Sequence, residues 1–167
     1  MPERPASGAS RRFVVVVLFE PVAVGQEIDR RNWPAHVTLV SNFVAAAAFD
    51  EVVAAVREVV EPAAPLVMEF GESALFGAHH DVPVRLAISA GAVELHHRLV
   101  AAIELLPGYT PDERAHWREG YRPHVTLKHG ITAPEGETRA ARQIAVAHLD
   151  GHLAKVLGTV TLPTADA

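Results

Sequence analysis

The tetrapeptide His-Val-Thr-Leu occurs twice in this chain, at residues 36–39 and 124–127. Side chains at positions i and i+2 of a β-strand project from the same face, roughly 7 Å apart, because each residue advances about 3.3 Å. On a strand, His36 and Thr38 therefore share one face, and so do His124 and Thr126. Each copy would present an imidazole and a hydroxyl together, while the neighbouring valine and leucine pack on the opposite, apolar face.

Two such pairs that converge across a groove have the groups needed to hydrolyse a phosphate ester. A neutral imidazole accepts a proton from water and a protonated one donates to the departing oxygen, and an unperturbed pKa of about 6.5 makes both forms available near neutrality. The two threonine hydroxyls would hydrogen-bond the non-bridging phosphate oxygens. Either histidine can serve as the base, depending on how the substrate lies. This chemistry requires no metal ion and no cofactor.

The motif pair, the second copy lying within RPHVTL, resembles the two-histidine (2H) phosphoesterase superfamily, whose signature is two His-x-Thr/Ser motifs about half a chain apart. The likeness to its 2'-5' RNA ligase-like and RNA 2',3'-cyclic phosphodiesterase branch extends from RFVVVVLF at residues 12–19 to GTVTL at 158–162. It implies a bilobal α+β fold with pseudo-twofold duplication, in which each lobe is a mostly antiparallel sheet backed by helices. The active-site groove would lie between the lobes.

The same resemblance implies metal-independent hydrolysis of a 2',3'-cyclic phosphate. It assigns His36 and His124 as the acid–base pair and Thr38 and Thr126 as the residues that bind the substrate phosphate. The expected partner is therefore a small nucleotide or an RNA 3' end that carries a cyclic phosphate. Two alternatives stay open: a non-catalytic nucleotide- or RNA-end-binding module that uses the same groove, and 2'-5' RNA ligase activity, which the acidic charge and the missing ATP motif disfavour.

The sequence departs from this family pattern next to both motifs. The branch that opens RNA cyclic phosphates often carries an arginine shortly after the second motif, where this chain has Lys128-His129-Gly130. Lys128 shares parity with His124, so we expect it to reach the groove. The first motif continues as VSNF instead of a glycine-containing turn. Tyr121 and Trp33, just upstream of the motifs, would either stack on a base or pack at a lobe edge.

The other histidines have simpler interpretations. His79 and His80 fall in an expected hairpin loop, and His96 and His97 fall near the start of an expected helix, where core packing or solvent accounts for them. His148 and His152 have the i, i+4 spacing of a metal pair, but Gly151 stands where the helix should end. The chain has no cysteine, which excludes disulfides, a thiolate nucleophile and Cys-ligated zinc. We predict no metal site.

Hydrophobic periodicity predicts the elements that must position the motifs. Strands are expected at residues 12–19, 36–43, 65–77, 81–90, 124–127 and 155–162, and helices at 49–60, 93–106 and 139–149. This order is not the regular alternation of a doubly wound parallel sheet, and it favours an α+β protein with mostly antiparallel sheets. We expect a flexible tail over residues 1–10 and a single bilobal 2H phosphoesterase-like domain over 11–167.

Composition narrows the class of partner. About half of the residues are apolar, the formal net charge is −5, and no run of basic residues exceeds a pair. Binding along a nucleic-acid duplex usually requires a basic stripe, so we expect no long duplex partner. The apolar run 13–19 is too short to span a bilayer and lacks the cleavage site of a signal peptide. We expect a cytoplasmic monomer that does not bind membranes.

Overall fold

The computed structural model describes residues 9–62 and 64–164. Most of the expected tail, residues 1–8, lies outside this part of the chain. In chain order the elements are β1 (Arg11–Leu18), β2 (Glu27–Asp29), β3 (His36–Ala45), α1 (Phe49–Val60), β4 (Val67–Phe76), β5 (Val82–Ile88), α2 (Ala90–Ile103), β6 (Thr110–Pro111), the short 3-10 helices η1 (Arg114–His116) and η2 (Arg118–Gly120), β7 (His124–Thr126), β8 (Thr138–Ala140), β9 (Gln143–Asp150) and β10 (Leu153–Thr161).

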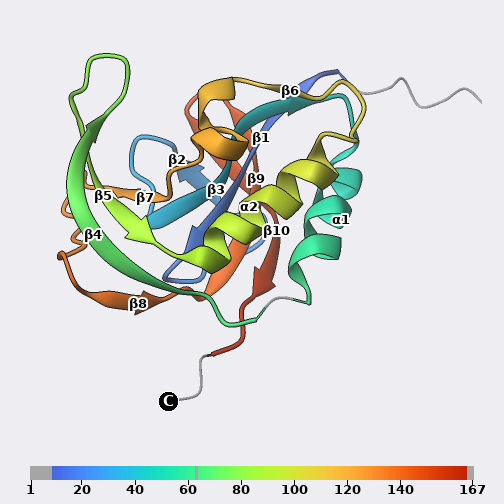
Figure 1. The fold of residues 1–167 in the computed structure, drawn as a ribbon. Coiled ribbons are helices and arrows are strands. Elements are labelled where there is room, and N and C mark those ends of the chain that lie inside the picture. Colours follow the sequence, from blue (N-terminus) through green and yellow to red (C-terminus); the bar gives the residue numbers. More distant parts are fainter. Residues whose placement is uncertain (1–8, 63, 165–167) are drawn as a thin grey trace, which may run out of the picture.

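The strands form two sheets, one for each lobe (Figure 1). The larger sheet has the order β2-β10-β9-β1-β3-β6, and the smaller has the order β7-β5-β4-β8. Every strand pairing in the two sheets is antiparallel. The expected α+β class with antiparallel sheets is therefore confirmed. The larger sheet joins strands from both ends of the chain, since β1 lies between β3 and β9.

Strand β1 is apolar and buried from Phe13 to Leu18, because both of its faces are covered there. Phe13, Val15 and Val17 belong to the main core, which also contains residues of both helices and of the smaller sheet. The alternate residues, Val14, Val16 and Leu18, belong to a second apolar cluster with Ile28 of β2 and with residues of β9 and β10. Burial of both faces is typical of a near-continuous run of valines at the centre of a sheet.

The helices pack against each other and against the larger sheet, α1 on β9 and β10 and α2 on β3. Helix α1 has the predicted bounds, and its buried residues Val52, Val56 and Val60 repeat every four positions. Helix α2 begins three residues earlier than predicted, because the Ser89 hydroxyl accepts a hydrogen bond from the backbone N–H of Ala92 and caps the helix. No helix in the described part of the chain is long and apolar enough to cross a membrane.

The helix predicted for residues 139–149 is wrong: this segment forms β8 and β9. Strand β9 lies between β1 and β10, and both of its faces are buried. Ile144 and Val146 contribute to the main core, whereas Ala145 and Ala147 contribute to the second cluster. An apolar run buried on both faces has no period of two, so periodicity alone does not distinguish it from a helix. The second motif is consequently not followed by a helix, unlike the first.

Candidate active site

The two motifs lie on strand edges that face each other from opposite sheets. Strand β7 is an outermost strand of the smaller sheet. In the larger sheet, β6 pairs with β3 only at Phe43 and Val44, so the beginning of β3 has no strand partner on the side away from β1. Strands β3 and β7 contact each other there. His36 is the first residue of β3 and His124 the first residue of β7, so each motif lies at the start of its strand.

The two imidazoles are held in the same way. Nδ1 of His36 lies 2.8 Å from the backbone oxygen of Pro34, and Nδ1 of His124 lies 2.8 Å from the backbone oxygen of Arg122. A carbonyl oxygen only accepts hydrogen bonds, so the proton of each neutral ring is on Nδ1. Nε2 of both rings therefore carries a free lone pair. In both motifs the acceptor is the carbonyl two residues upstream, which is the equivalence that a duplicated fold predicts.

Each imidazole is also backed by one aromatic ring. The ring centroid of Trp33 lies 5.1 Å from that of His36, and the ring centroid of Phe76 lies 4.6 Å from that of His124. Contact with a fixed aromatic side chain limits the rotation of each imidazole. Phe76 ends β4, so the smaller sheet supplies this contact from a hairpin far from the second motif in sequence. The motifs themselves give no indication of Phe76.

Burial lowers the pKa of both motif histidines. For His36 the backbone acceptor Pro34 opposes this shift, and the charge of His124 adds to it. For His124 the acceptor Arg122 opposes it, and the charges of His116 and Arg122 add to it. A positive charge on one ring is thus felt at the other, as expected for two rings that share one groove. Without a bound anion both rings favour the neutral form, and a negative charge placed between them would favour protonation.

The free edge of β3 is closed by side chains. The Tyr121 hydroxyl donates to the carbonyl oxygen of Thr38 at 2.8 Å, and Nδ1 of His96 donates to that of Leu39 at 2.6 Å. A β-bulge occurs here, because Val15 pairs with Val40 while Val16 pairs with Thr38. The bulge leaves Leu39 without a partner in β1, and the His96 side chain on α2 donates the hydrogen bond to its carbonyl oxygen.

Tyr121 and His96 form one unit. Their rings are parallel, 4.0 Å apart, and Nε2 of His96 accepts a hydrogen bond from the backbone N–H of Arg118. His96 is fully buried, in agreement with the core-packing interpretation. One ring face and the hydroxyl of Tyr121 are thus engaged in packing at the lobe edge, and Tyr121 also lines a cavity together with Thr38 and His124. The unit attaches the η1–η2 segment to the strand that carries the first motif.

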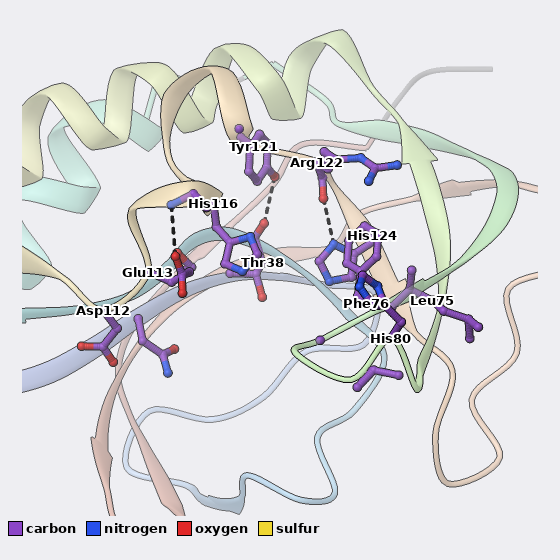
Figure 2. Close-up of a pocket in the computed structure, with 17 residues that line it drawn as sticks. Thr38, Leu75, Phe76, His80, Asp112, Glu113, His116, Tyr121, Arg122 and His124 are labelled. Atoms are coloured by element: carbon purple, nitrogen blue, oxygen red, sulfur yellow. Dashed lines mark hydrogen bonds between the residues drawn. The ribbon is translucent and has the colours of Figure 1, made fainter.

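A cavity of about 640 Å³ opens on the His124 side of the motifs (Figure 2). Thr38 and His124 both line it, so the threonine of one motif meets the histidine of the other. His116 lines it too, and Figure 2 shows Thr38 between the side chains of His116 and His124. The apolar part of its lining includes Leu75, Phe76, Val82 and Val84, and the polar part includes Ser41, Asn42, Asp112 and Glu113. We call this the His124 cavity.

A second cavity, of about 460 Å³, contains the complementary pair His36 and Thr126. Trp33 and Lys128 also line it, so Lys128 lies on the same side of the second motif as Thr126. Val82 of β5 borders both cavities, and each cavity is lined by one residue of each motif. We call this one the His36 cavity. The structure thus brings together all four motif residues and Lys128 around two neighbouring cavities, which together we call the groove.

Two groups of lining residues were not expected from the sequence. His116 ends the short 3-10 helix η1 and Phe76 ends β4, and neither segment carries a recognisable motif. Ser41 and Asn42 reach the His124 cavity because β3 contains extra residues relative to β1, which disturb its alternation. His148, which we considered as half of a metal pair, packs its ring against Phe13 and Phe49 instead. In residues 9–62 and 64–164, no three His, Cys, Asp or Glu side chains are arranged to hold a metal ion.

Comparison with known proteins gives a family and a fold. The model of the 2'-5' RNA ligase superfamily matches residues 19–156. Among solved structures, Escherichia coli LigT complexed with 3'-AMP has a TM-score of 0.54 at 13% identity and covers 92% of this chain and 99% of its own. A Thermus thermophilus protein has a TM-score of 0.56 at 18% identity, covering 92% and 98%. A structure described as a phosphoesterase has a TM-score of 0.55 at 13% identity, covering 92% and 99%. No curated protein matches the chain.

Proposed function

The chain belongs to the 2'-5' RNA ligase superfamily, and from this premise we propose that it is a metal-independent phosphodiesterase that opens a 2',3'-cyclic phosphate on a small nucleotide or an RNA 3' end. The observation that carries the proposal is the equivalent presentation of His36 and His124, each with Nδ1 bonded to the carbonyl two residues upstream. Both rings therefore offer Nε2 for proton transfer. Acid–base catalysis by two histidines needs this arrangement.

In the proposed reaction the cyclic phosphate lies between the two imidazoles. Nε2 of one ring takes a proton from water as the water oxygen bonds to phosphorus. Nε2 of the other ring, protonated, donates to the ribose oxygen as its bond to phosphorus breaks. The product is a phosphomonoester with a free 2'- or 3'-hydroxyl, and the two rings have exchanged protonation states. The Thr38 and Thr126 hydroxyls bind the non-bridging oxygens, where negative charge increases in the transition state.

Two further observations support a nucleotide substrate. The lowered pKa values of His36 and His124 favour the neutral form of both rings, so a bound phosphate anion would itself promote protonation of the acid. LigT of E. coli, which shares the fold, has been solved complexed with 3'-AMP, with phosphate and with ATP. The cytoplasmic location and the monomeric state expected from the sequence belong to the same proposal.

The test is hydrolysis of adenosine 2',3'-cyclic phosphate by His36→Ala and His124→Ala variants, with EDTA present throughout. Each variant should lose on the order of 10²–10⁴-fold in kcat, the usual contribution of a positioned acid or base. His97→Ala is the matched control, because His97 is exposed on α2 and lines neither cavity. Unchanged rates in either motif variant, or loss of wild-type activity in EDTA, would overturn the proposal. Saturable binding of 3'-AMP without any turnover would instead favour the non-catalytic binding module.

A further inference from the structure

The two cavities beside the motif histidines carry different charges. The His124 cavity is lined by Asp112 and Glu113, with Arg122 as its single Lys or Arg side chain. The His36 cavity is lined by Arg30, Arg31 and Lys128 and by no Asp or Glu. The groove is therefore polarised along its length. This asymmetry is absent from the motifs, which are identical in sequence, so it comes from residues outside them.

The positive charge of the His36 cavity is only partly neutralised. Arg31 forms a salt bridge with Asp29 at 2.8 Å. Arg30 donates to the carbonyl oxygen of Gly151 at 2.8 Å, a neutral partner that leaves its charge in place. Among the described residues, neither Arg30 nor Lys128 forms a salt bridge. Two cationic side chains thus remain available beside His36 and Thr126, and both carry several N–H donors suited to phosphate oxygens.

Building on the proposed function, we propose that the His36 cavity binds a second phosphate group of the same substrate, one ribose away from the cyclic phosphate. The reacting phosphate carries a single negative charge, and the motif histidines and threonines already contact it in the proposed reaction. Arg30 and Lys128 would be redundant for a substrate with no other anionic group. A terminal 5'-phosphate and the internucleotide phosphate of an RNA 3' end share the required chemistry.

The connectivity of a nucleotide fits the two cavities. The base is attached to the ribose at C1', and C5' with its oxygen is attached at C4'. These groups therefore lie on either side of a ribose whose 2'- and 3'-oxygens hold the cyclic phosphate. With the phosphate between the two motifs, whose residues line both cavities, one group can enter each cavity. The apolar wall of the His124 cavity, with Phe76 and Val84, suits a base. The cationic wall of the His36 cavity suits the anionic 5' end.

The experiment compares kcat/KM of the wild-type protein for three substrates: adenosine 2',3'-cyclic phosphate, the same nucleotide with a 5'-phosphate, and a diadenosine RNA ending in a 2',3'-cyclic phosphate. Both two-phosphate substrates should be preferred by about tenfold at low salt. Their log kcat/KM should fall more steeply with log salt than that of the one-phosphate substrate, because salt screens the additional charge interaction. Preference for the diadenosine alone would identify the internucleotide phosphate as the source, and preference for the 5'-phosphorylated nucleotide would identify the terminal one.

The variants Arg30→Gln and Lys128→Gln locate the effect. Each should reduce the ratio of kcat/KM between two-phosphate and one-phosphate substrates several-fold, and the pair together should bring it close to one. Lys155→Gln is the matched control, since Lys155 is the other lysine of the chain and is exposed on β10, outside both cavities. It should leave the ratio unchanged. Equal use of all three substrates by the wild type, or a ratio that survives both cavity variants, would overturn the inference.

Failure of the proposed function is distinguishable from failure of this inference. If the wild type hydrolyses no cyclic phosphate, calorimetric binding of adenosine 3'-phosphate and of adenosine 3',5'-bisphosphate decides the question without turnover. Tighter binding of the bisphosphate that is lost in Arg30→Gln and Lys128→Gln would uphold the second phosphate site. Equal affinity for the two nucleotides would reject it.

Discussion

The backbone carbonyls of Pro34 and Arg122 decide which nitrogen of each motif imidazole is available for proton transfer. The sequence identifies the two rings through their spacing, but it does not show the tautomer, because the acceptor is a main-chain oxygen that any residue could supply. Prolines precede both motifs at slightly different distances, Pro34 two residues before His36 and Pro123 one residue before His124. The two loops nevertheless bring equivalent carbonyls to Nδ1.

Removing only the hydroxyl of Thr38 tests its proposed role as a phosphate ligand. Thr38→Val keeps the shape of the side chain, and we expect kcat for 2',3'-cyclic phosphate hydrolysis to fall by about 10²-fold, the usual cost of losing one donor to a developing oxyanion. Thr38→Ser retains the hydroxyl and is the control, with a rate close to wild type. Steady-state kinetics of both variants is the measurement. Similar rates for the valine and serine variants would show that the hydroxyl has no catalytic part.

At the scale of the elements, the sequence predicted strands and helices best where composition or end signals identify them. Strand β1, although buried on both faces, was identified by its β-branched residues. Helix α1 was correctly bounded because polar residues and Pro62 delimit its apolar stripe. Strand β9 was mistaken for a helix because its two buried faces remove the alternation. The β-bulges of β3 could not be predicted from the sequence either, since a bulge depends on the register with β1 and not on composition.

The buried His96 on α2 links this helix to β3 and to η2, and its removal should destabilise the fold. In His96→Leu the carbonyl oxygen of Leu39 and the N–H of Arg118 lose their partners. An unsatisfied buried polar group costs about 1–3 kcal/mol, so we expect the free energy of unfolding to fall by about 3 kcal/mol. Urea denaturation followed by circular dichroism measures this change. His97→Leu is the matched control, one residue along α2 but exposed, and its stability should be close to wild type.

The same histidine makes the stability of the fold depend on pH. Burial lowers the pKa of His96, and the nearby charges of His97 and Arg118 add to the shift, while the Leu39 carbonyl opposes it. The unfolded chain, with a histidine pKa of about 6.5, therefore binds a proton more readily than the folded one. Stability is complete above that value and decreases as the pH falls below it. The decrease between about pH 7 and pH 5 should be smaller in His96→Leu than in the wild type.

At the scale of the whole molecule, the site exists only because two sheets bring their edges together. Each motif alone is a short strand with one histidine, and the sequence predicted the meeting of the motifs through the family resemblance, not through any local signal. The polarity of the groove could not be predicted at all, because Arg30 and Lys128 lie far apart in the sequence and meet only in the fold. The site therefore depends on both lobes. Because the charge of His124 affects the pKa of His36, the two histidines titrate as a coupled pair.

This coupling predicts the shape of the pH–rate profile. The proposed reaction needs one neutral and one protonated imidazole, and in the free protein burial lowers the pKa of both His36 and His124. The singly protonated pair is then most abundant below the ordinary histidine pKa of about 6.5, so kcat/KM should reach its maximum on the acidic side of that value. A bound phosphate anion raises both pKa values, and the maximum of kcat should therefore lie at higher pH than that of kcat/KM.

Steady-state kinetics of 2',3'-cyclic phosphate hydrolysis across the range from about pH 4.5 to pH 9, at constant ionic strength, measures both profiles. The variant His116→Asn refines the test, because the charge of His116 contributes to the lowered pKa of His124. Its loss should raise that pKa and move the kcat/KM maximum toward neutrality. A kcat/KM maximum on the alkaline side of neutrality in the wild type would contradict two desolvated imidazoles that share one proton. A shift of the kcat/KM maximum to lower pH in His116→Asn would contradict the placement of His116 near His124.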